Sequence, residues 1–585
     1  MTEDLSKHKK KHAIAAALFA AIAMSIVQLA AAQTRPDAGT ILQEQIKERP
    51  PIPPAEAPRV IPPADTRPAQ RLAPTLKIMV EAFRVTGNTV FSTQELQAEL
   101  KEFVGKEADV NGLLDAADKV KSFYRQKGYF LAQAYLPQQE LRVGVTKLVE
   151  IAVIEGRFGE VSSNLPADVR VSKTLIDGIL SKEIKPGEVI TEQRLERPLL
   201  LVSDLPGVNV KSDIRPGNAV GLANVTANVE KRPTVDGNWE FDNHSSRFIG
   251  EFRASLGLNL NNPLGVGDQL SMKLIGSDDR FYFARVAYAL PVNYYGTRMG
   301  LSYSEFGYRL AQPEFAALRS NGAGKVVTAF GFHPIIRQRN ANLIFQGAVE
   351  EKYLTDKTDS IPTVEERKFL TTKVGMVGDW RDGLLGGGLN SFSLVYTEGY
   401  VDIRPEAFRA TDQGATGLRT QGRYSKENYD YRRLQKITNA VTFLFSAQGQ
   451  FANKNLPSAE RSGLGGPSGV RAYPAGEGGG NEAHVFTGEL RYLVTDLMPN
   501  VLSGDATFSA FYDLGFSNLN DAPRDTFTAT KNKRAISGYG LGFTIGKDQH
   551  YVLRTSMAWQ AEREEPQSDG VTRTPRVWFQ GIKWF

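Results

Sequence analysis

Residues Arg461–His484 read RSGLGGPSGVRAYPAGEGGGNEAH, a segment with eight glycines and two prolines. This composition excludes a regular helix or strand. Phe443–Phe451 before it and Val485–Val494 after it both alternate between apolar and polar residues, as β-strands do. A long glycine-rich loop joining two strands, with Arg471 between apolar neighbours at its centre, predicts a loop that packs inside a larger structure.

The same alternation recurs throughout residues 234–585, for example at Tyr282–Leu290 and Tyr551–Trp559. Segments of about ten alternating residues separated by turns are typical of a transmembrane antiparallel β-barrel. A soluble β-sandwich shows the same alternation. The length of about 350 residues, apolar faces rich in Tyr and Trp, and a strand ending Lys583-Trp584-Phe585 favour the barrel. This length accommodates about 14–18 strands, an even number being expected.

The amino-acid composition argues against several classes of protein and of functional site. The 585 residues contain 23% charged and 41% hydrophobic residues, which argues against an α-helical membrane protein, and the net charge of +5 is too balanced to indicate a nucleic-acid partner. There is no cysteine, which excludes disulfides, thiolate nucleophiles and most structural zinc sites. His244, His333, His484 and His550 form no ligand-spaced pair, so we expect no metal site, no cofactor and no enzymatic activity.

The first 76 residues divide into three parts. Residues 1–32 have lysines, an apolar run and an Ala-rich site before Gln33, which predicts a signal peptide. Residues 33–49 predict a short helix with Asp37 as a cap and with Ile41, Leu42 and Ile46 as its apolar residues. Such a short helix is stable only when docked. Residues 50–76 are rich in proline and predict an extended linker.

Residues 77–156 predict a compact unit with the order β-α-α-β-β. Ser92-x-x-Glu95 is a capping box that opens a helix, and Gly128 ends a second one. Residues 157–233 repeat this order. Pro198 falls inside the second helix of that repeat, where we expect it to kink or split the helix.

The first unit resembles a POTRA domain. The residues that carry the resemblance are Phe83, Val85, Gly87, Asn88, Phe91, Tyr124, Gly128, Tyr129, Glu155 and Gly156. The two units together resemble the POTRA pair of two-partner secretion transporters, the outer-membrane family that exports filamentous haemagglutinins and haemolysins. The resemblance implies a sixteen-stranded barrel preceded by two β-α-α-β-β POTRA domains and a short plug helix at residues 33–49, which occupies the pore in relatives.

The resemblance also implies a role for Arg471. In this family the arginine of a V-R-G-Y motif in the sixth extracellular loop folds back into the barrel and meets the aspartate of an F-x-D-x-G motif. The matching residues are Val470, Arg471, Ala472 and Tyr473, and Phe511, Asp513 and Gly515. Ala472 takes the place of a glycine that is commoner in this motif, and its side chain would strain the backbone if φ were positive there. Phe585 matches the terminal aromatic residue that the outer-membrane assembly machinery reads.

The function implied is export of one large, unfolded exoprotein across the outer membrane of a Gram-negative bacterium, with the POTRA domains in the periplasm. The implied partners are a haemagglutinin-like or haemolysin-like passenger, outer-membrane lipid and, during biogenesis, the barrel-assembly machinery, but no nucleic acid. One alternative is an outer-membrane protein assembly or insertion factor, which also carries POTRA domains and the arginine loop. A porin and a surface adhesin or receptor barrel are further alternatives, against which the POTRA pair argues.

Overall fold

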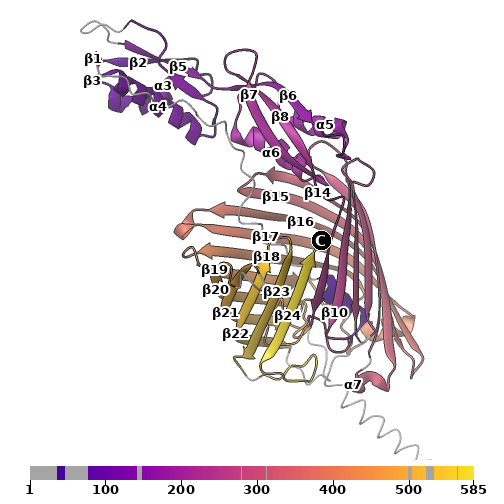
Figure 1. Ribbon diagram of the computed structural model, residues 1–585. Coiled ribbons are helices and arrows are strands. Elements are labelled where there is room, and N and C mark those ends of the chain that lie inside the picture. The colour runs from indigo at the N-terminus through magenta and orange to yellow at the C-terminus, as the bar shows by residue number, and fades with distance from the viewer. Residues whose placement is uncertain are drawn as a thin grey trace, which may run out of the picture.

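The computed structural model describes residues 36–46, 77–140, 148–278, 280–310, 312–497, 503–521, 532–562 and 564–585. Two small α/β units follow one another at one end of a large closed barrel, and a short helix lies inside the barrel (Figure 1). The predicted signal peptide (1–32) and linker (50–76) lie outside the described residues. No helix among the described residues is long and apolar enough to cross a membrane.

The first unit has the predicted order of elements, with two additional short strands. Its elements are β1 Ile78–Val80, β2 Ala82–Thr86, α3 Thr93–Glu99, η1 Lys101–Phe103, β3 Lys106–Ala108, α4 Val110–Gln126, β4 Gln133–Tyr135 and β5 Leu148–Ile154. The main sheet has the order β2-β5-β4, with β2 and β5 parallel. The capping box predicted at Ser92 and Glu95 opens α3. Leu96, Val120 and Ile151 belong to the core that joins both helices to the sheet.

The second unit repeats this order. It comprises β6 Arg157–Asn164, α5 Lys173–Glu183, α6 Glu192–Ser203, β7 Val208–Pro216 and β8 Leu222–Lys231, with sheet order β6-β8-β7. Of the two effects expected of Pro198, a kink or a split, the split does not occur, because α6 is one helix with Pro198 inside it. Pro198 is buried together with Leu195, Leu199 and Val202, so packing supports the turn in which proline provides no hydrogen-bond donor.

The second unit is docked on the adjacent end of the barrel by ion pairs and close packing. The Arg337 guanidinium donates to both carboxylate oxygens of Asp204, at 2.8 and 2.7 Å. The Arg197 guanidinium donates to the backbone carbonyls of Pro334 and Ile335. These contacts fix the second unit at the rim of the barrel.

Sixteen antiparallel strands close the barrel, as expected. They are β9 Val235–Asp242, β10 Arg253–Asn261, β11 Gln269–Ser277, β12 Tyr282–Pro291, β13 Arg298–Arg309, β14 Ser320–Arg337, β15 Ala341–Thr358, β16 Thr363–Asp382, β17 Gly388–Arg404, β18 Gly422–Lys436, β19 Val441–Ala452, β20 Glu482–Val494, β21 Asp505–Asn518, β22 Lys533–Lys547, β23 Tyr551–Gln560 and β24 Arg576–Trp584. Short helical turns lie in the connections, at α7 Pro313–Ala316, η2 Leu384–Gly386, α8 Glu406–Gln413 and η3 Ser458–Glu460.

Side chains alternate between the two faces of the barrel wall. On β21, Phe508 and Tyr512 are 44% and 50% exposed on the outside, whereas Asp513 is fully buried on the inside. An apolar outer face and a polar lumen satisfy the requirements of a bilayer. Strand β9 follows directly after the second unit, so it runs from the barrel end next to that unit to the far end. Because the strands alternate in direction, the connections after β9, β19 and β23 all lie at the far end (Figure 1). We call residues 243–252, 453–481 and 561–575 loops 1, 6 and 8.

Strands β9 and β24 close the barrel through the shortest ladder. Their register pairs only Gln580–Trp584 with Asn238–Asp242, whereas β15 pairs along its whole length with β16. Phe585 extends the seam, because its backbone exchanges hydrogen bonds of 3.0 and 3.1 Å with Gly237. Toward loop 1, the Asn243 side chain donates to the Val577 carbonyl and accepts from the Phe579 amide.

Candidate functional site

Loop 6 folds back into the lumen and is held there by Arg471. The Arg471 guanidinium donates from Nε and Nη2 to the two carboxylate oxygens of Asp513, at 2.8 and 2.9 Å. Its Nη1 donates to Glu489 at 2.9 Å, and its backbone amide donates to Asp513 at 3.1 Å. The guanidinium carbon lies 3.2 Å from the centre of the Phe511 ring. A planar, forked cation is suited to this combination of paired acceptors and a ring face.

We call the contacts of Arg471 with Asp513, Glu489 and Phe511 the Arg471 lock. Other groups bind to this lock, and the cluster as a whole carries no net charge. The Thr487 hydroxyl donates to Asp513 at 2.9 Å, and the Trp578 indole donates to the Arg471 carbonyl at 2.7 Å. Arg491 binds the second oxygen of Glu489 at 2.8 Å. Two arginines therefore face two carboxylates, which offsets the cost of placing these charges out of bulk water.

The apolar neighbours of Arg471 pack on the strands that carry its acceptors. Val470, Ala472 and Tyr473 are buried in one cluster with residues of β20, β21 and β22. Gly515 leaves room for Val470, since a Cβ at Gly515 would lie 2.9 Å from a Val470 methyl. The Tyr473 hydroxyl donates to the Glu562 carbonyl at 3.3 Å. The structure thus brings together all seven residues predicted for the lock: Val470, Arg471, Ala472, Tyr473, Phe511, Asp513 and Gly515.

Ala472 fits where the sequence pattern suggested glycine. It is not among the described residues that adopt a positive φ, so no strain arises from its Cβ. Its methyl group faces Gly538 on β22, where an added Cβ would lie 2.5 Å from the Ala472 Cβ. Gly538, which has no side chain, therefore leaves room on the barrel wall for the methyl group of Ala472.

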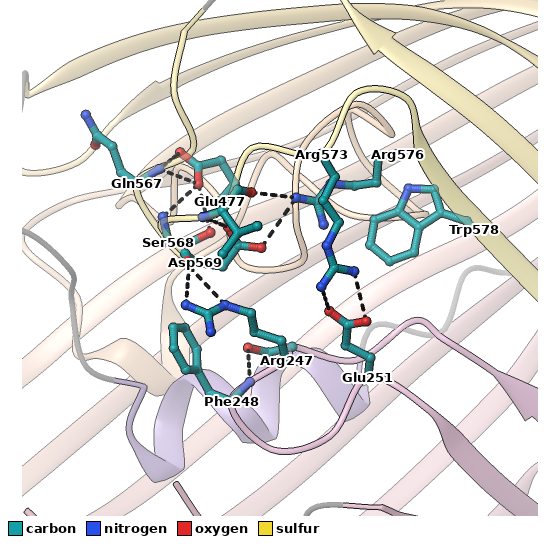
Figure 2. Close-up of polar contacts among 12 residues, drawn as sticks. Arg247, Phe248, Glu251, Glu477, Gln567, Ser568, Asp569, Arg573, Arg576 and Trp578 are labelled. Atoms are coloured by element: carbon teal, nitrogen blue, oxygen red, sulfur yellow. Dashed lines mark hydrogen bonds and ion pairs between the residues drawn. The ribbon is translucent and has the colours of Figure 1, made fainter. Parts of the chain in front are cut away.

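Further along loop 6, Glu477 joins this loop to loop 8. Its fully buried carboxylate accepts from the backbone amides of Gln567 and Ser568 and from the Ser568 hydroxyl, the Ser568 contacts being 2.8 and 2.7 Å. It also lies 2.9 Å from the Arg534 guanidinium on β22. Figure 2 shows Glu477 enclosed by the turn of loop 8 that these residues form.

Loop 8 is in turn joined to loop 1 across the β9–β24 seam. Arg573 forms an ion pair of 2.6 Å with Glu251, and Arg247 donates to the Asp569 carbonyl (Figure 2). Arg247 also pairs with Glu314 at 2.6 Å. Polar contacts therefore join loop 6 to loop 8 and loop 8 to loop 1.

The helix inside the barrel is α2, Ala38–Ile46, within the range predicted for the plug. Asp37 accepts from the Thr40 amide and hydroxyl at 2.9 and 2.8 Å, which caps the helix as predicted. Ala38, Ile41 and Leu42 are buried against wall residues from β11 to β18 and against loop 6. The third predicted apolar residue, Ile46, is the last residue of the helix. Docking supplies the stability that so short a helix lacks in water.

Polar residues line the lumen that remains beside α2 and loop 6. A cavity of about 1450 Å³ is bordered by Glu44, Glu240, Arg253, Arg491 and Arg554 among many others. A second cavity of about 580 Å³ lies against β14–β20. Among the described residues, no group of three or more His, Asp or Glu side chains is placed to hold a metal ion.

Most of the POTRA signature residues build one corner of the first unit. Glu155, after β5, accepts from the amides of Thr89 and Val90 at 2.5 and 2.7 Å, and from the Tyr124 hydroxyl at 3.0 Å. Burial raises the pKa of Glu155, but these hydrogen bonds outweigh burial and hold its pKa below the usual value. The Phe91 ring packs edge-on against Tyr124 and Tyr129.

The remaining signature residues fix the backbone at this corner or belong to the core beside it. Gly87, Gly128 and Gly156 all adopt positive φ, and a Cβ at Gly87 would lie 2.2 Å from the Val153 carbonyl oxygen. Asn88 donates from its side chain to the Phe91 carbonyl at 2.8 Å. The other two, Phe83 and Val85, lie in the core of the unit.

Comparison with known proteins identifies the family. The model of the haemolysin secretion/activation protein family ShlB/FhaC/HecB matches residues 221–545, and the model of the ShlB-type POTRA domain matches residues 78–156. The chain belongs to this family of secretion proteins. The predicted resemblance is thereby confirmed, and the protein is an outer-membrane transporter of two-partner secretion that works with a large exoprotein. Its POTRA domains lie in the periplasm.

Individual relatives agree with this family. The heme/hemopexin transporter protein HuxB of Haemophilus influenzae strain 86-028NP is 27% identical over 494 residues, which cover 84% of each chain. The outer membrane transporter CdiB of Dickeya dadantii is 25% identical over 438 residues, 73% of each chain.

Solved structures show the same fold. CdiB from Escherichia coli superposes with a TM-score of 0.66 at 21% identity, covering 90% of this chain and 94% of CdiB. BamA from Haemophilus ducreyi lacking POTRA domains 1–3 gives a TM-score of 0.51 at 13% identity, covering 86% of this chain and all of that one. At these identities the likeness concerns the fold alone.

Sequence reasoning missed several residues of the lumen. Thr487, Glu489 and Trp578 complete the Arg471 lock, and their only signal was an inward position on alternating strands. Glu460 and Glu477 in loop 6 gave no signal in the sequence, because their partners come from strands and loops distant in the chain.

Proposed function

We propose that the transporter captures its exoprotein as an unfolded chain at the POTRA pair and passes it through the barrel lumen to the cell surface. The observation that carries this proposal is the lumen itself. A closed barrel of sixteen strands contains a polar interior that α2 and loop 6 partly fill, both held by side-chain contacts and not by the wall ladder. Elements held in this way can move aside without unfolding the barrel.

Capture fits the open edges of the POTRA sheets. An extended chain adds to a sheet edge mainly through backbone hydrogen bonds, which makes little demand on its sequence. In the second POTRA domain, residues 187–190 cover the start of edge strand β6, through bonds such as Phe158 N to Glu188 O at 2.9 Å. The other edge strand, β7 (Val208–Pro216), has nine residues and pairs only with β8 in the described part of the chain. We therefore assign the unfolded exoprotein to the β7 edge.

In the resting transporter, α2 closes the pore together with loop 6. No nucleotide is available outside the inner membrane, so folding of a haemagglutinin-like or haemolysin-like exoprotein at the surface, which prevents return, supplies the direction of transport. The barrel's outer face contacts outer-membrane lipid, and Phe585 is the residue that the barrel-assembly machinery reads during biogenesis.

A secretion assay tests this function. A strain lacking the transporter is complemented with the wild type or with a deletion of residues 77–233. We expect one extracellular exoprotein to disappear in the null and deletion strains while other outer-membrane proteins keep their normal amounts. A general fall of outer-membrane barrel proteins in the null strain would contradict export and would identify an assembly factor.

A further inference from the structure

A buried cluster of charges holds the start of loop 6 against the barrel wall, away from the Arg471 lock. The Glu460 carboxylate lies 2.6 Å from the ammonium group of Lys352 on β15 and 2.8 Å from that of Lys426 on β18. Glu460 and Lys352 are each 1% exposed and Lys426 is 7% exposed. Charges this deeply buried persist only when they are paired.

The backbone of loop 6 is fixed at the same place. The Glu460 carbonyl accepts from Lys426 at 2.8 Å and from the Gln450 amide at 3.0 Å. Gln450 also donates to the Asn481 carbonyl at 3.0 Å, which ties the two ends of the loop together. Both the side chain and the peptide group of Glu460 are therefore bound to the wall.

The three-residue turn that contains Glu460 is the surface on which α2 rests. This turn is η3, Ser458–Glu460. A Cβ at Gly39 would lie 2.4 Å from the Ser458 hydroxyl and 2.5 Å from the Ala459 amide nitrogen, so the helix backbone lies directly against η3. The Ser458 hydroxyl donates to Asp37 at 2.5 Å, and the Gln43 side chain donates to the Ala459 carbonyl.

The Arg471 lock makes no comparable contact with the plug. The hydrogen bonds of Arg471 go to Asp513, Glu489 and Trp578, all on the barrel wall. Glu460 helps to set the position of η3, because it binds two lysines that approach from different strands. The Ser458 hydroxyl in the same turn accepts from Arg367 on β16 at 3.2 Å. Without the charge of Glu460, Lys352 and Lys426 would face each other with only the neighbouring Glu350 to compensate Lys352.

We propose that Glu460 is a second anchor of loop 6 and a positioning residue for the plug: the Glu460–Lys352–Lys426 cluster holds η3 in place as the seat of α2. This inference rests on the proposed role of α2 as the resting closure of the pore. It separates two roles within one loop. Glu460 holds the seat of the plug and so adds to the direct contacts of the plug with the wall, such as the ion pair of 2.7 Å between Asp37 and Arg367. Arg471 holds the loop to β20 and β21.

The chain is suited to a cross-linking test because it contains no cysteine. Gln43→Cys and Ala459→Cys place one thiol on the plug and one on its seat in the full-length transporter. The rate at which a short thiol-specific reagent links them reports how long α2 occupies the seat. Potassium chloride currents of the variants without these cysteines, recorded in planar lipid bilayers, report whether the pore is open.

Glu460→Gln should weaken the seating equilibrium of α2 roughly tenfold, the effect of losing a charged hydrogen bond. It should therefore lower the cross-linking rate and raise the open fraction of the channel toward that of a transporter lacking residues 36–46. Lys352→Met in the Glu460→Gln background should recover part of the loss, because it removes one uncompensated charge. Gly39→Ala should loosen the plug from its own side and leave every residue of the barrel unchanged.

Glu477→Gln is the matched control. Glu477 is equally buried in the same loop, but it binds loop 8 and Arg534. We expect its cross-linking rate to equal that of the wild type. Heat-modifiable migration in electrophoresis verifies that each variant has a folded barrel, and Gly39→Ala keeps the test valid if Glu460→Gln does not fold.

The outcomes separate the inference from the function on which it rests. An unchanged cross-linking rate in Glu460→Gln, or an equal loss in Glu477→Gln, would overturn the proposal that Glu460 holds the seat. If deleting residues 36–46 left the current unchanged, the proposed closure by α2 would fail, while the cross-linking rates would still decide the role of Glu460.

Discussion

Two of the buried charges that bind loop 6 to the barrel use different chemistry. Arg471 presents a planar guanidinium to two carboxylates and an aromatic ring, within an apolar cluster at β20–β22. Glu460 presents a carboxylate to two flexible lysines at β15 and β18, beside the plug. The comparison shows that one loop inside a barrel is attached at separate places by a buried cation and by a buried anion.

The largest effect on secretion is expected at Arg471. Arg471→Ala leaves Asp513 buried without its partner, at a cost of about 3–5 kcal/mol. We expect secretion to fall at least tenfold while the amount of folded barrel is unchanged, measured as exoprotein in the medium against transporter in the outer membrane. Asp513→Asn should have a similar effect, and the double variant should be little worse than either single one. Wild-type secretion by an abundant Arg471→Ala protein would contradict the lock.

A smaller effect tests how closely loop 6 packs on the wall. Gly538→Ala places a methyl group 2.5 Å from the Ala472 Cβ. Overpacking of this kind costs about 1–3 kcal/mol. We expect secretion to fall several-fold and to recover when Ala472→Gly is added. The same assay would refute the contact if the second substitution gave no recovery.

The next prediction concerns the stability of the POTRA pair, outside the barrel. Glu155 is a buried charge that makes no contact with loop 6, so it provides a reference for the charges in that loop. Glu155→Gln should destabilise the POTRA pair by about 1–3 kcal/mol at neutral pH. Because the folded-state pKa of Glu155 is lowered, its contribution is present above the unfolded pKa and is lost as the pH falls through the folded value. Urea unfolding of residues 77–233, which contain their own two cores, should therefore show a wild-type advantage at pH 7 that shrinks in acid. An advantage independent of pH would contradict this account.

The smallest effect is expected for Ala472→Gly alone. It removes a methyl group from a buried contact without relieving any positive φ, so we expect a change of about 1 kcal/mol or less. Secretion and thermal stability should both stay near the wild-type values. A clear gain in either would show that alanine is strained in the lock after all.

The sequence predicted the elements that follow local patterns. Alternation with period two predicted the barrel, the capping box at Ser92 predicted the start of α3, and Asp37 predicted the start of α2. The family motifs led to Arg471 and Asp513. Pro198 does not divide α6, because the burial of this helix supports it at a position where local rules predict an interruption.

The residues that escaped prediction depend on register between distant strands. Glu460 meets Lys352 and Lys426 only because β15 and β18 place those lysines at the same height in the lumen. Glu477 meets loop 8 only after the barrel has closed. Alternation shows that such residues face inward, but a single sequence does not show which of them meet.

The most direct test of the account asks whether the exoprotein passes through the lumen. Ser509 borders the lumen and Phe508, next to it on β21, is 44% exposed on the outer face. A photoreactive group is attached to Ser509→Cys or to Phe508→Cys in a transporter stalled on its exoprotein, the one that disappears from the medium in the secretion assay. We predict cross-links to the exoprotein from residue 509 and none from residue 508. Cross-links from residue 508, or from neither residue, would contradict transport through the barrel.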